Sequence, residues 1–408
     1  MNPNGTERLH ALDATRGFAL LLGIVFHATL SFLPGPPGAA LWIVMDNQRS
    51  LTLGVLFHVL HIFRMTTFFV IAGFFAHMSF HKKGTRGFIR DRLKRIGIPL
   101  LVGWPILFSL IVAASIWGAV VMAHGKKLPP PPPYPGFPAF PLTHLWFLYM
   151  LLLLYGATLA ARAALVRLAP FEQLRDAADR IVRGVIVHPL GLVVLAAPTA
   201  TALYALPSWL AWFGIPTPDS SLVPNIAAVV GFGTAFVFGW LVQRQTGLLE
   251  IWKRRWLMNL AMAVGLTGFG LFLTGPAPVI VPAPHDGRTA LYAASYALAA
   301  WSWTFGLIGL SLRFLSNHSA VRRYIADASY WLYLIHIPLI MALQILLSQL
   351  SWPWWVKFPL ILAIAFPLMF ASYQLFVRHS FIGRTLNGPR ESLSNKTAAS
   401  AALQEALP

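Results

Sequence analysis

The sequence contains no cysteine among its 408 residues. This absence excludes disulfide bonds, a thiolate nucleophile and any metal site built on cysteine. Charge is also scarce, because Asp, Glu, Lys and Arg together make up only 11% of the chain, against about 25% in a typical soluble domain. Since 57% of the residues are hydrophobic, the composition indicates a polytopic membrane protein, most of whose length forms membrane spans.

Acidic residues are the scarcer of the two charge types, with 13 Asp and Glu against 31 Lys and Arg. We place all of them in loops, in tails or at the ends of spans, as with Asp13 and Asp327. Ion-coupled transporters commonly use buried carboxylates as relays, so their absence at mid-depth argues against a cation pathway. The net charge of +18 is typical of nucleic-acid binding, but these cations lie between apolar runs, where the positive-inside rule places them. We therefore expect a lipid bilayer as partner and no nucleic acid.

Apolar runs of spanning length divide the chain and predict an all-α, polytopic bundle of about ten transmembrane helices. They lie at about 14–33, 53–79, 96–122, 144–165, 183–206, 222–244, 256–274, 289–314, 328–348 and 354–378. Residues 1–390 form one integral membrane domain in this interpretation. Residues 391–408 are polar and rich in Ser and Ala, which predicts a disordered cytoplasmic tail.

The loops between these runs differ strongly in positive charge. The loops on one side contain only five cations, Arg49, Lys126, Lys127, Arg288 and Lys357. One further cation lies inside a span, and all the others lie in the loops and tails on the other side. The positive-inside rule then predicts that both termini are cytoplasmic, which requires an even number of spans. The N-terminus has no cleavable signal pattern, so the first run is expected to remain as a span.

Two outer loops, 128–141 and 275–288, are rich in proline and are expected to be extended. They can rim an outward-facing site or serve only as rigid spacers.

The first span carries the most informative pattern, LDATRGFALLLGIVFH at 12–27. Arg16 lies at the start of the apolar helix, and His27 lies eleven residues further along, about 16 Å at helical rise. An ionisable residue at that depth is rare and costly, and it predicts chemistry within the membrane.

The second span adds His58, His61 and Arg64, which recur every three residues and therefore share one helical face. Arg64 is expected near the midplane, and His144 and His336 belong to later spans. A buried set of histidine and arginine suits a general base with an electrophilic helper.

Each buried histidine also has a simpler interpretation, as a side chain that links two helices by a hydrogen bond. A zinc site formed by His27, His58 and His61 is conceivable, but no further ligand spacing supports it, and we expect no metal. The basic run 82–95 is more often a topology signal than a ligand site.

Five segments, in order along the chain, resemble the acyltransferase-3 family of integral membrane acyltransferases. They are Arg16 with His27, preceded by Leu-Asp; HIFRMTTFFVIAGFF at 61–75; RDRLKRIGIP at 90–99, which contains the pair Arg92 and Arg95; HLWFL at 144–148; and ASYWLYLIHIPL at 328–339. HIFRM, RIGIP and HLWFL look closest to a branch of the family that succinylates periplasmic glucans. One departure is Ala72, at a position where the family often has serine.

The resemblance implies a multi-pass enzyme of the bacterial inner membrane. Its donor is acyl-CoA from the cytoplasm, carrying acetyl or succinyl, and its acceptor is a hydroxyl of a carbohydrate on the outer side. His27 is then the general base, with Arg16 and Arg64 as catalytic partners. His58, His61, His144 and His336 are expected to contact substrate.

The basic segment next to the third span offers arginines for the phosphates of coenzyme A, because the guanidinium fork is planar and always charged. We expect Arg90, Arg92 and Arg95 to bind there, with Arg86 as a weaker candidate. The rival interpretations are a transporter or flippase with a histidine-lined cavity and, less economically, a membrane scaffold.

Overall fold

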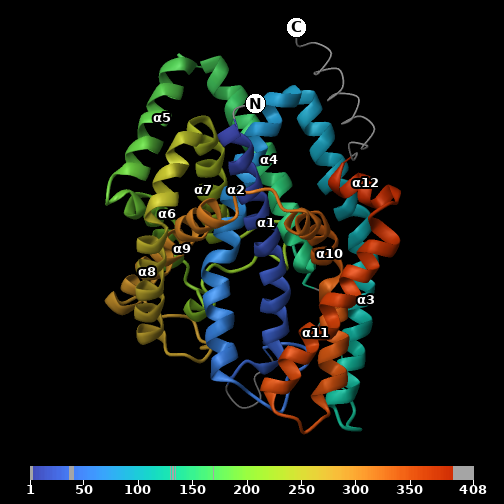
Figure 1. The fold of residues 1–408 in the computed structure, drawn as a ribbon. Helices are drawn as coiled ribbons and strands as arrows, with labels where there is room; N and C mark the ends of the chain where they lie inside the picture. The colour runs from blue at the N-terminus through green and yellow to red at the C-terminus, as the bar shows by residue number, and fades with distance from the viewer. Residues whose placement is uncertain are drawn as a thin grey trace.

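The structure of the chain is a computed structural model, which describes residues 3–35, 41–128, 130, 133, 135–168 and 170–388. The tail predicted at 391–408 lies outside the described residues. Within the described part the fold is all-helical, apart from an isolated antiparallel bridge between Ala139 and Ser221. The helices, shown in Figure 1, are α1 Pro3–Thr29, α2 Leu51–Arg92, α3 Ile98–Met122, α4 Trp146–Leu168, α5 Phe171–Val187, α6 Gly191–Tyr204, α7 Ile226–Val242, α8 Leu249–Thr274, α9 Gly287–Phe314, α10 Ala320–Ser348, α11 Trp354–Ser372 and α12 Phe381–Asn387.

Six helical segments in the described part are long and apolar enough to cross a membrane, or seven if the bent pair α5 and α6 counts as one span. Two of the six, Leu51–Met122 and Ile226–Thr274, each contain two of the helices above. The chain is therefore a multi-pass membrane protein. The number of ten spans is not established by length and hydropathy alone.

The apolar run at 183–206 was expected to form one helix, and this expectation is wrong. The structure breaks the run between α5 and α6, whose axes differ by 102°. Helix α6 has only 14 residues, or about 21 Å of helix, which is shorter than a hydrocarbon core of about 30 Å. The break falls at His188-Pro189, because a residue that precedes proline is pushed out of the helical region.

The basic stretch at 80–96, expected to be a loop, is helical almost throughout. Helix α2 continues to Arg92 and joins α3 through one wide helical turn at Leu93–Gly97. Arginine and lysine are good helix formers, so charge alone does not end a helix where it leaves the apolar layer. Gly84, with φ of 67°, bends α2, and the positive φ suits a residue without a side chain.

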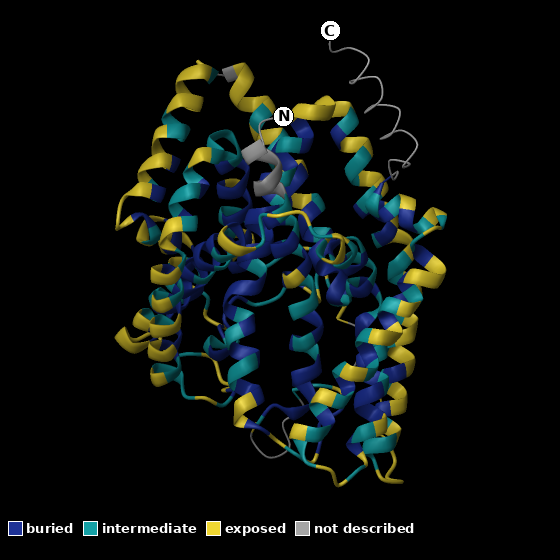
Figure 2. Cartoon of the chain, viewed as in Figure 1, coloured by how far each residue is buried: buried dark blue, intermediate teal, exposed yellow. Residues whose placement is uncertain are grey.

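Helix α9 is not among the six segments that length and composition alone mark as able to cross a membrane. It is instead buried by its neighbours along most of its length, and its many Ala, Ser, Thr and Gly residues allow close helix packing. Helix α3 is the opposite case, because it exposes most of its apolar surface and buries only Pro99, Leu107, Ala114 and Gly118 (Figure 2). A helix that packs against other helices thus needs small residues, whereas a helix that faces lipid needs an apolar surface.

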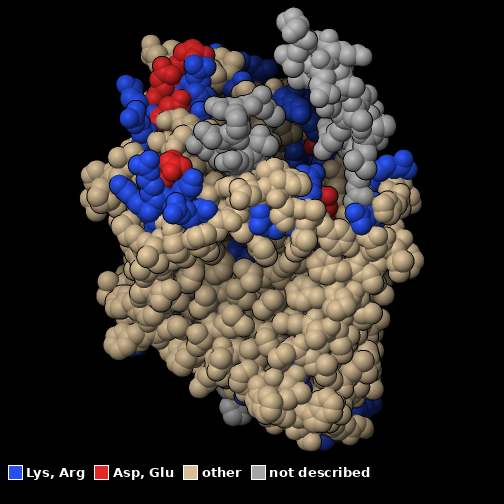
Figure 3. Space-filling view, in the orientation of Figure 1, with Lys and Arg blue, Asp and Glu red and all other residues tan. Residues whose placement is uncertain are grey.

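Charged side chains gather at the end of the molecule where the N-terminus lies, and the rest of the visible surface is almost entirely uncharged (Figure 3). We call this the charged end. The basic part of α2 beyond Gly84 lies there, and so does α5 (Figure 1).

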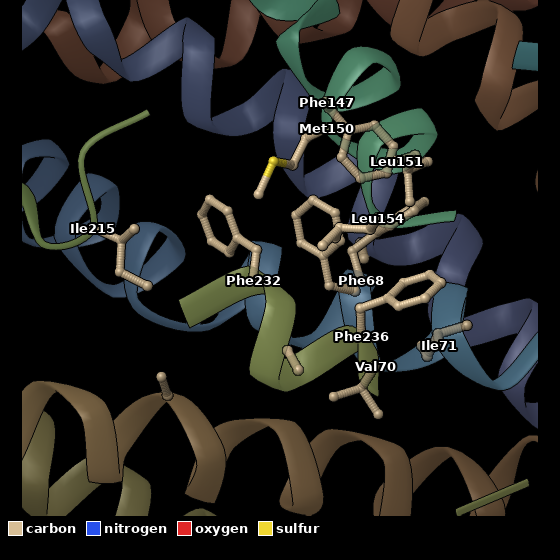
Figure 4. Close-up of a cluster of buried hydrophobic side chains, with 14 of the residues drawn as sticks. Phe68, Val70, Ile71, Phe147, Met150, Leu151, Leu154, Ile215, Phe232 and Phe236 are labelled. Carbon is tan, nitrogen blue, oxygen red and sulfur yellow. The ribbon is translucent and has the colours of Figure 1, made fainter. Parts of the chain in front are cut away.

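Aromatic side chains from three helices form the core beside the site (Figure 4). Phe68 of α2 meets Phe147 of α4 edge to face, with ring centroids 4.5 Å apart. Phe69 stacks on Phe232 of α7 at 4.9 Å. Such pairs each contribute about 0.5–1.5 kcal/mol beyond the area they bury, and they fix α2 and α4 on either side of the cavities described below.

Candidate active site

Two cavities adjoin inside the bundle. The larger, of about 340 Å³, is lined by charged side chains from the charged end. The smaller, of about 70 Å³, is lined by three of the predicted histidines, His27, His144 and His336. We call them the arginine cavity and the histidine cavity. Both are lined by Leu20, Phe68, Phe147 and Tyr333, so these four side chains form the boundary between them.

The histidine cavity brings together residues that are far apart in the sequence. His27 comes from α1, Arg64 from α2, and His336 from α10. His144, from the short turn that precedes α4, and Thr217 also line it. Four of the candidate residues, His27, Arg64, His144 and His336, therefore line one cavity.

The hydrogen bonds of His27 define which ring nitrogen is free. Its Nδ1 lies 2.7 Å from the carbonyl oxygen of Gly23 and 3.1 Å from Nε2 of His336. A carbonyl oxygen only accepts hydrogen bonds, so Nδ1 of His27 carries the proton in the neutral ring. Nε2 of His27 has no hydrogen-bond partner among the described residues, which leaves its lone pair available as a base.

The other two histidines of the cavity are held by carbonyl groups of α10. Nδ1 of His336 lies 2.6 Å from the carbonyl of Tyr333, and Nε2 of His144 lies 2.9 Å from that of Leu334. Pro338 explains the second contact, because it has no N–H to donate to the carbonyl four residues earlier. His144 donates to the carbonyl that the proline leaves unpaired.

Arg64 is buried, with 8% of its surface exposed, and its guanidinium carbon lies 4.2 Å from the centre of the Phe26 ring. None of the ion pairs among the described residues includes it, and its Nε has no hydrogen-bond partner there. Gly23 makes room for it, because a Cβ on Gly23 would lie 2.9 Å from Nη1 of Arg64. The site therefore contains a buried cation without a counter-ion, directly beside His27.

Gln344 of α10 was not among the candidate residues of the sequence analysis. Its amide nitrogen donates to the carbonyls of His27 and Ala28, at 3.1 and 3.3 Å, and its amide oxygen accepts from the Trp42 indole at 2.9 Å. The last carbonyls of a helix have no partner within it. Gln344 thus caps the end of α1 from the neighbouring helix. Its position eight residues after His336, on the same helical face, is the signal that points to it.

Two of the predicted histidines, His58 and His61, do not line either cavity. His58 is fully buried, with Nδ1 3.0 Å from the carbonyl of Trp212, so it holds the loop between α6 and α7. The ring of His61 packs on Phe26 and Phe57, with centroids 5.6 and 5.8 Å away. Within the described residues no group of three or more His, Asp or Glu side chains is placed to hold a metal ion.

Arg16 lies in the arginine cavity rather than beside His27. It is paired with Asp13 at 3.2 Å and shares the cavity with Arg92, Arg95 and Arg323. Arg16 therefore belongs to the group that can meet an anion at the charged end.

Arg92 and Arg95 are both held by Asp91, at 3.2 and 3.0 Å. Arg92 also donates to Ser79 at 3.0 Å, and Arg95 donates to the carbonyl of Asn387, at the end of α12, at 3.2 Å. These contacts orient the two guanidinium groups before any ligand arrives.

The remaining arginines of the predicted set lie at the surface. Arg86 and Arg90 are exposed and do not line the cavity. Ala72, at the position where serine was noted as common, does line the arginine cavity, so this chain offers a methyl group there instead of a hydroxyl.

The fold and this site define a multi-pass helical membrane protein with a buried histidine and arginine centre next to a cavity lined by arginine. A family model described as an acyltransferase domain, Acyl_transf_3, matches residues 9–374. The chain belongs to this acyltransferase-3 family, as its motifs predicted, and carries an acyl-transferring domain.

Curated relatives are similar over a shorter segment. Glucans biosynthesis protein C of Escherichia coli (strain SMS-3-5 / SECEC) is 37% identical over 107 residues, and the protein of that name from Shigella dysenteriae serotype 1 (strain Sd197) is 36% identical over 107 residues. The aligned segment covers 26% of this chain and 26% of each relative. No solved structure gives a significant match.

Proposed function

We propose that this protein is a membrane-embedded O-acyltransferase that moves an acyl group from cytoplasmic acyl-CoA to a hydroxyl of an extracytoplasmic glycan or glucan. The observation that carries the proposal is the direct adjacency of the two cavities, which share four lining side chains. A donor held by its phosphates in the arginine cavity can extend its narrow pantetheine arm toward His27 in the histidine cavity.

The donor phosphates are assigned to the guanidinium groups of Arg16, Arg92 and Arg95, with Arg323 as a further contact. Arginine binds phosphate with two parallel hydrogen bonds, and its charge is permanent. Because Arg90 is exposed outside the cavity, it contributes to this proposal only through the general positive field.

The reaction is assigned to His27 and Arg64. Nε2 of His27 takes the proton of the acceptor hydroxyl while the hydroxyl oxygen attacks the thioester carbonyl. The carbon–sulfur bond then breaks, and the departing thiolate of coenzyme A takes that proton from His27. The Arg64 guanidinium stabilises the oxyanion that forms between these steps, or binds the far carboxylate of a succinyl group.

The acceptor class follows from the relatives, whose name refers to the biosynthesis of glucans. An acceptor on the outer side would approach past His144 and Thr217, which line the histidine cavity. Acetyl and succinyl donors share the body of coenzyme A, so selectivity between them would depend on whether Arg64 binds the succinyl carboxylate.

The topology that fits this reaction has ten crossings, with the charged end in the cytoplasm of a bacterium and the protein in its inner membrane. Counting α2 and α3 separately, and likewise α7 and α8, supports this number once α9 and the α5–α6 pair are included. Reporter fusions after residues 135, 215 and 280 are expected to read outside, and those after 85, 172 and 320 inside. Two misplaced reporters would refute the scheme.

The test of function is acyl transfer by the purified protein in lipid nanodiscs, with radiolabelled succinyl-CoA or acetyl-CoA and a β-glucan acceptor. His27→Ala is expected to lose activity by about 10²–10⁴-fold, the usual loss for a general base. His379→Ala is the matched control, because His379 is exposed and outside both cavities. Wild-type activity of the His27 variant would refute the mechanism. In sealed vesicles, a protein that moves label across the membrane without transferring it to the acceptor would be a transporter.

A further inference from the structure

The charge that forms on His27 during catalysis has no carboxylate to balance it. In many sites with a histidine base, a carboxylate accepts the hydrogen bond from the second ring nitrogen and stabilises the imidazolium ion. Here no Asp or Glu among the described residues pairs or bonds with His27, and the second nitrogen meets His336 instead, at 3.1 Å. The neighbouring Arg64 is a cation and cannot take that role.

We propose that His336 is the positioning residue of the proposed acyl transfer: its Nε2 accepts the Nδ1–H of His27, keeps Nε2 of His27 free as the base, and shares the positive charge that forms there. This inference rests on the proposed function. It assigns His336 to the histidine base, where the sequence had placed it with the substrate.

The direction of the hydrogen bond follows from the atoms around His336. Its Nδ1 lies 2.6 Å from the Tyr333 carbonyl, which only accepts, so Nδ1 is the protonated nitrogen of the neutral ring. Its Nε2 therefore has a lone pair to offer to His27. The reverse direction would need a doubly protonated, buried His336 and would leave Nδ1 of His27 facing the carbonyl of Gly23 with no proton between them.

The chain of proton positions runs from the free Nε2 of His27 to the backbone carbonyl of Tyr333. When Nε2 of His27 takes the proton of the acceptor hydroxyl, the positive charge can pass along the bond to Nε2 of His336, whose Nδ1–H already points at the Tyr333 carbonyl. When the thiolate of coenzyme A leaves, it takes the proton from Nε2 of His27, and both rings return to neutral. Two protons change partners within the pair, and none is lost or gained overall.

The charged and titratable groups around His336 are few. His27 faces it from α1, Arg64 from α2 and His144 from the turn before α4, where the two ring centroids lie 5.3 Å apart. His144 is occupied by the carbonyl of Leu334. On α11, Lys357 is bound by Asp46. His336 is therefore the group in the described structure that is free to accept from His27.

Two substitutions separate the positioning role from simple packing. In His336→Gln the side-chain oxygen can reach the position of Nε2 and still accept from His27. In His336→Asn the amide nitrogen can reach the position of Nδ1 and still donate to Tyr333, but no side chain accepts from His27, and only the Gly23 carbonyl still does. We expect His336→Asn to lose at least about 10²-fold in kcat, as when a histidine loses the partner that orients it, with KM for acyl-CoA unchanged. His336→Gln is expected to keep more of kcat and to show a changed pH–rate profile, because an amide cannot take up a proton.

A second measurement needs no substitution of His336. Two-dimensional NMR of protein labelled with ¹⁵N-histidine reports which nitrogen carries the proton, and the signal of His27 is identified by its loss in His27→Ala. A proton on Nδ1 of His27 is expected, and a proton on Nε2 would overturn the inference even if the asparagine variant fails to fold.

The outcomes also separate this inference from the proposed function. If both His336 variants keep wild-type kcat while His27→Ala is inactive, the positioning role is refuted and the acyltransferase mechanism stands. The positioning role is equally refuted if the asparagine variant is more active than the glutamine variant. If His27→Ala itself is fully active, the proposed mechanism is refuted, and the positioning role of His336 is refuted with it.

Discussion

Replacing Arg64 by methionine is expected to make the protein more stable and to impair acyl transfer strongly. A buried cation at the centre of a membrane helix costs about 2.5–3.5 kcal/mol. The structure shows one main compensation, the contact with Phe26 at 4.2 Å, which contributes about 0.5–2 kcal/mol. Methionine has a similar length and no charge, so Arg64→Met should raise the free energy of unfolding by about 1–2 kcal/mol.

The same substitution removes the group that we assign to the oxyanion. Loss of one such donor typically costs about 10²–10³-fold in kcat. Arg64→Lys keeps the charge but not the planar fork, so it should also be strongly impaired. If Arg64 binds a succinyl carboxylate, Arg64→Met will lose succinyl transfer far more than acetyl transfer. If it stabilises the oxyanion, both will fall together.

The assay pairs thermal unfolding in detergent, followed by tryptophan fluorescence, with acyl transfer from both donors. The functional interpretation requires higher stability with lower activity, because a group kept only for packing would show the reverse. An Arg64→Met protein that is less stable and fully active with both donors would refute it, and the active site would then have to be sought around His144 and His336.

The other predictions concern the surroundings of this centre. Arg92→Ala and Arg95→Ala should weaken acyl-CoA binding in equilibrium titrations, and raising the salt concentration should weaken binding too, because salt screens charges. The exposed Arg90→Ala is the matched control; wild-type affinity in all three variants would assign these charges to topology alone. Gly23→Ala adds a methyl group 2.9 Å from Nη1 of the neighbouring guanidinium and should lower kcat with little change in melting temperature, which an unchanged kcat would contradict. Gln344→Leu leaves two carbonyls of α1 and an indole N–H without their partner and should cost about 1–3 kcal/mol of stability, measured by denaturation; an unchanged midpoint would rule out the cap.

The sequence by itself determined the class of the protein and most of its helices. Runs of apolar residues can satisfy their backbone groups in lipid only as helices, so their positions followed directly from local composition. The motifs around Arg16 and His27 indicated the family, and the absence of mid-depth carboxylates drew attention to Arg64. These properties are local, because they depend only on residues that are near one another in the sequence.

Which residues meet was decided by the tertiary structure alone. His27 and His336 are separated by 309 positions, and Gln344 gave no signal of its own, because helix packing leaves no periodicity that names a partner. Arg16 joined the arginine cavity, and His58 turned to the carbonyl of Trp212, although both follow regular helical spacing from residues at the site. Helical periodicity fixes the face on which a side chain lies, whereas the contacts of that face depend on how the helices assemble.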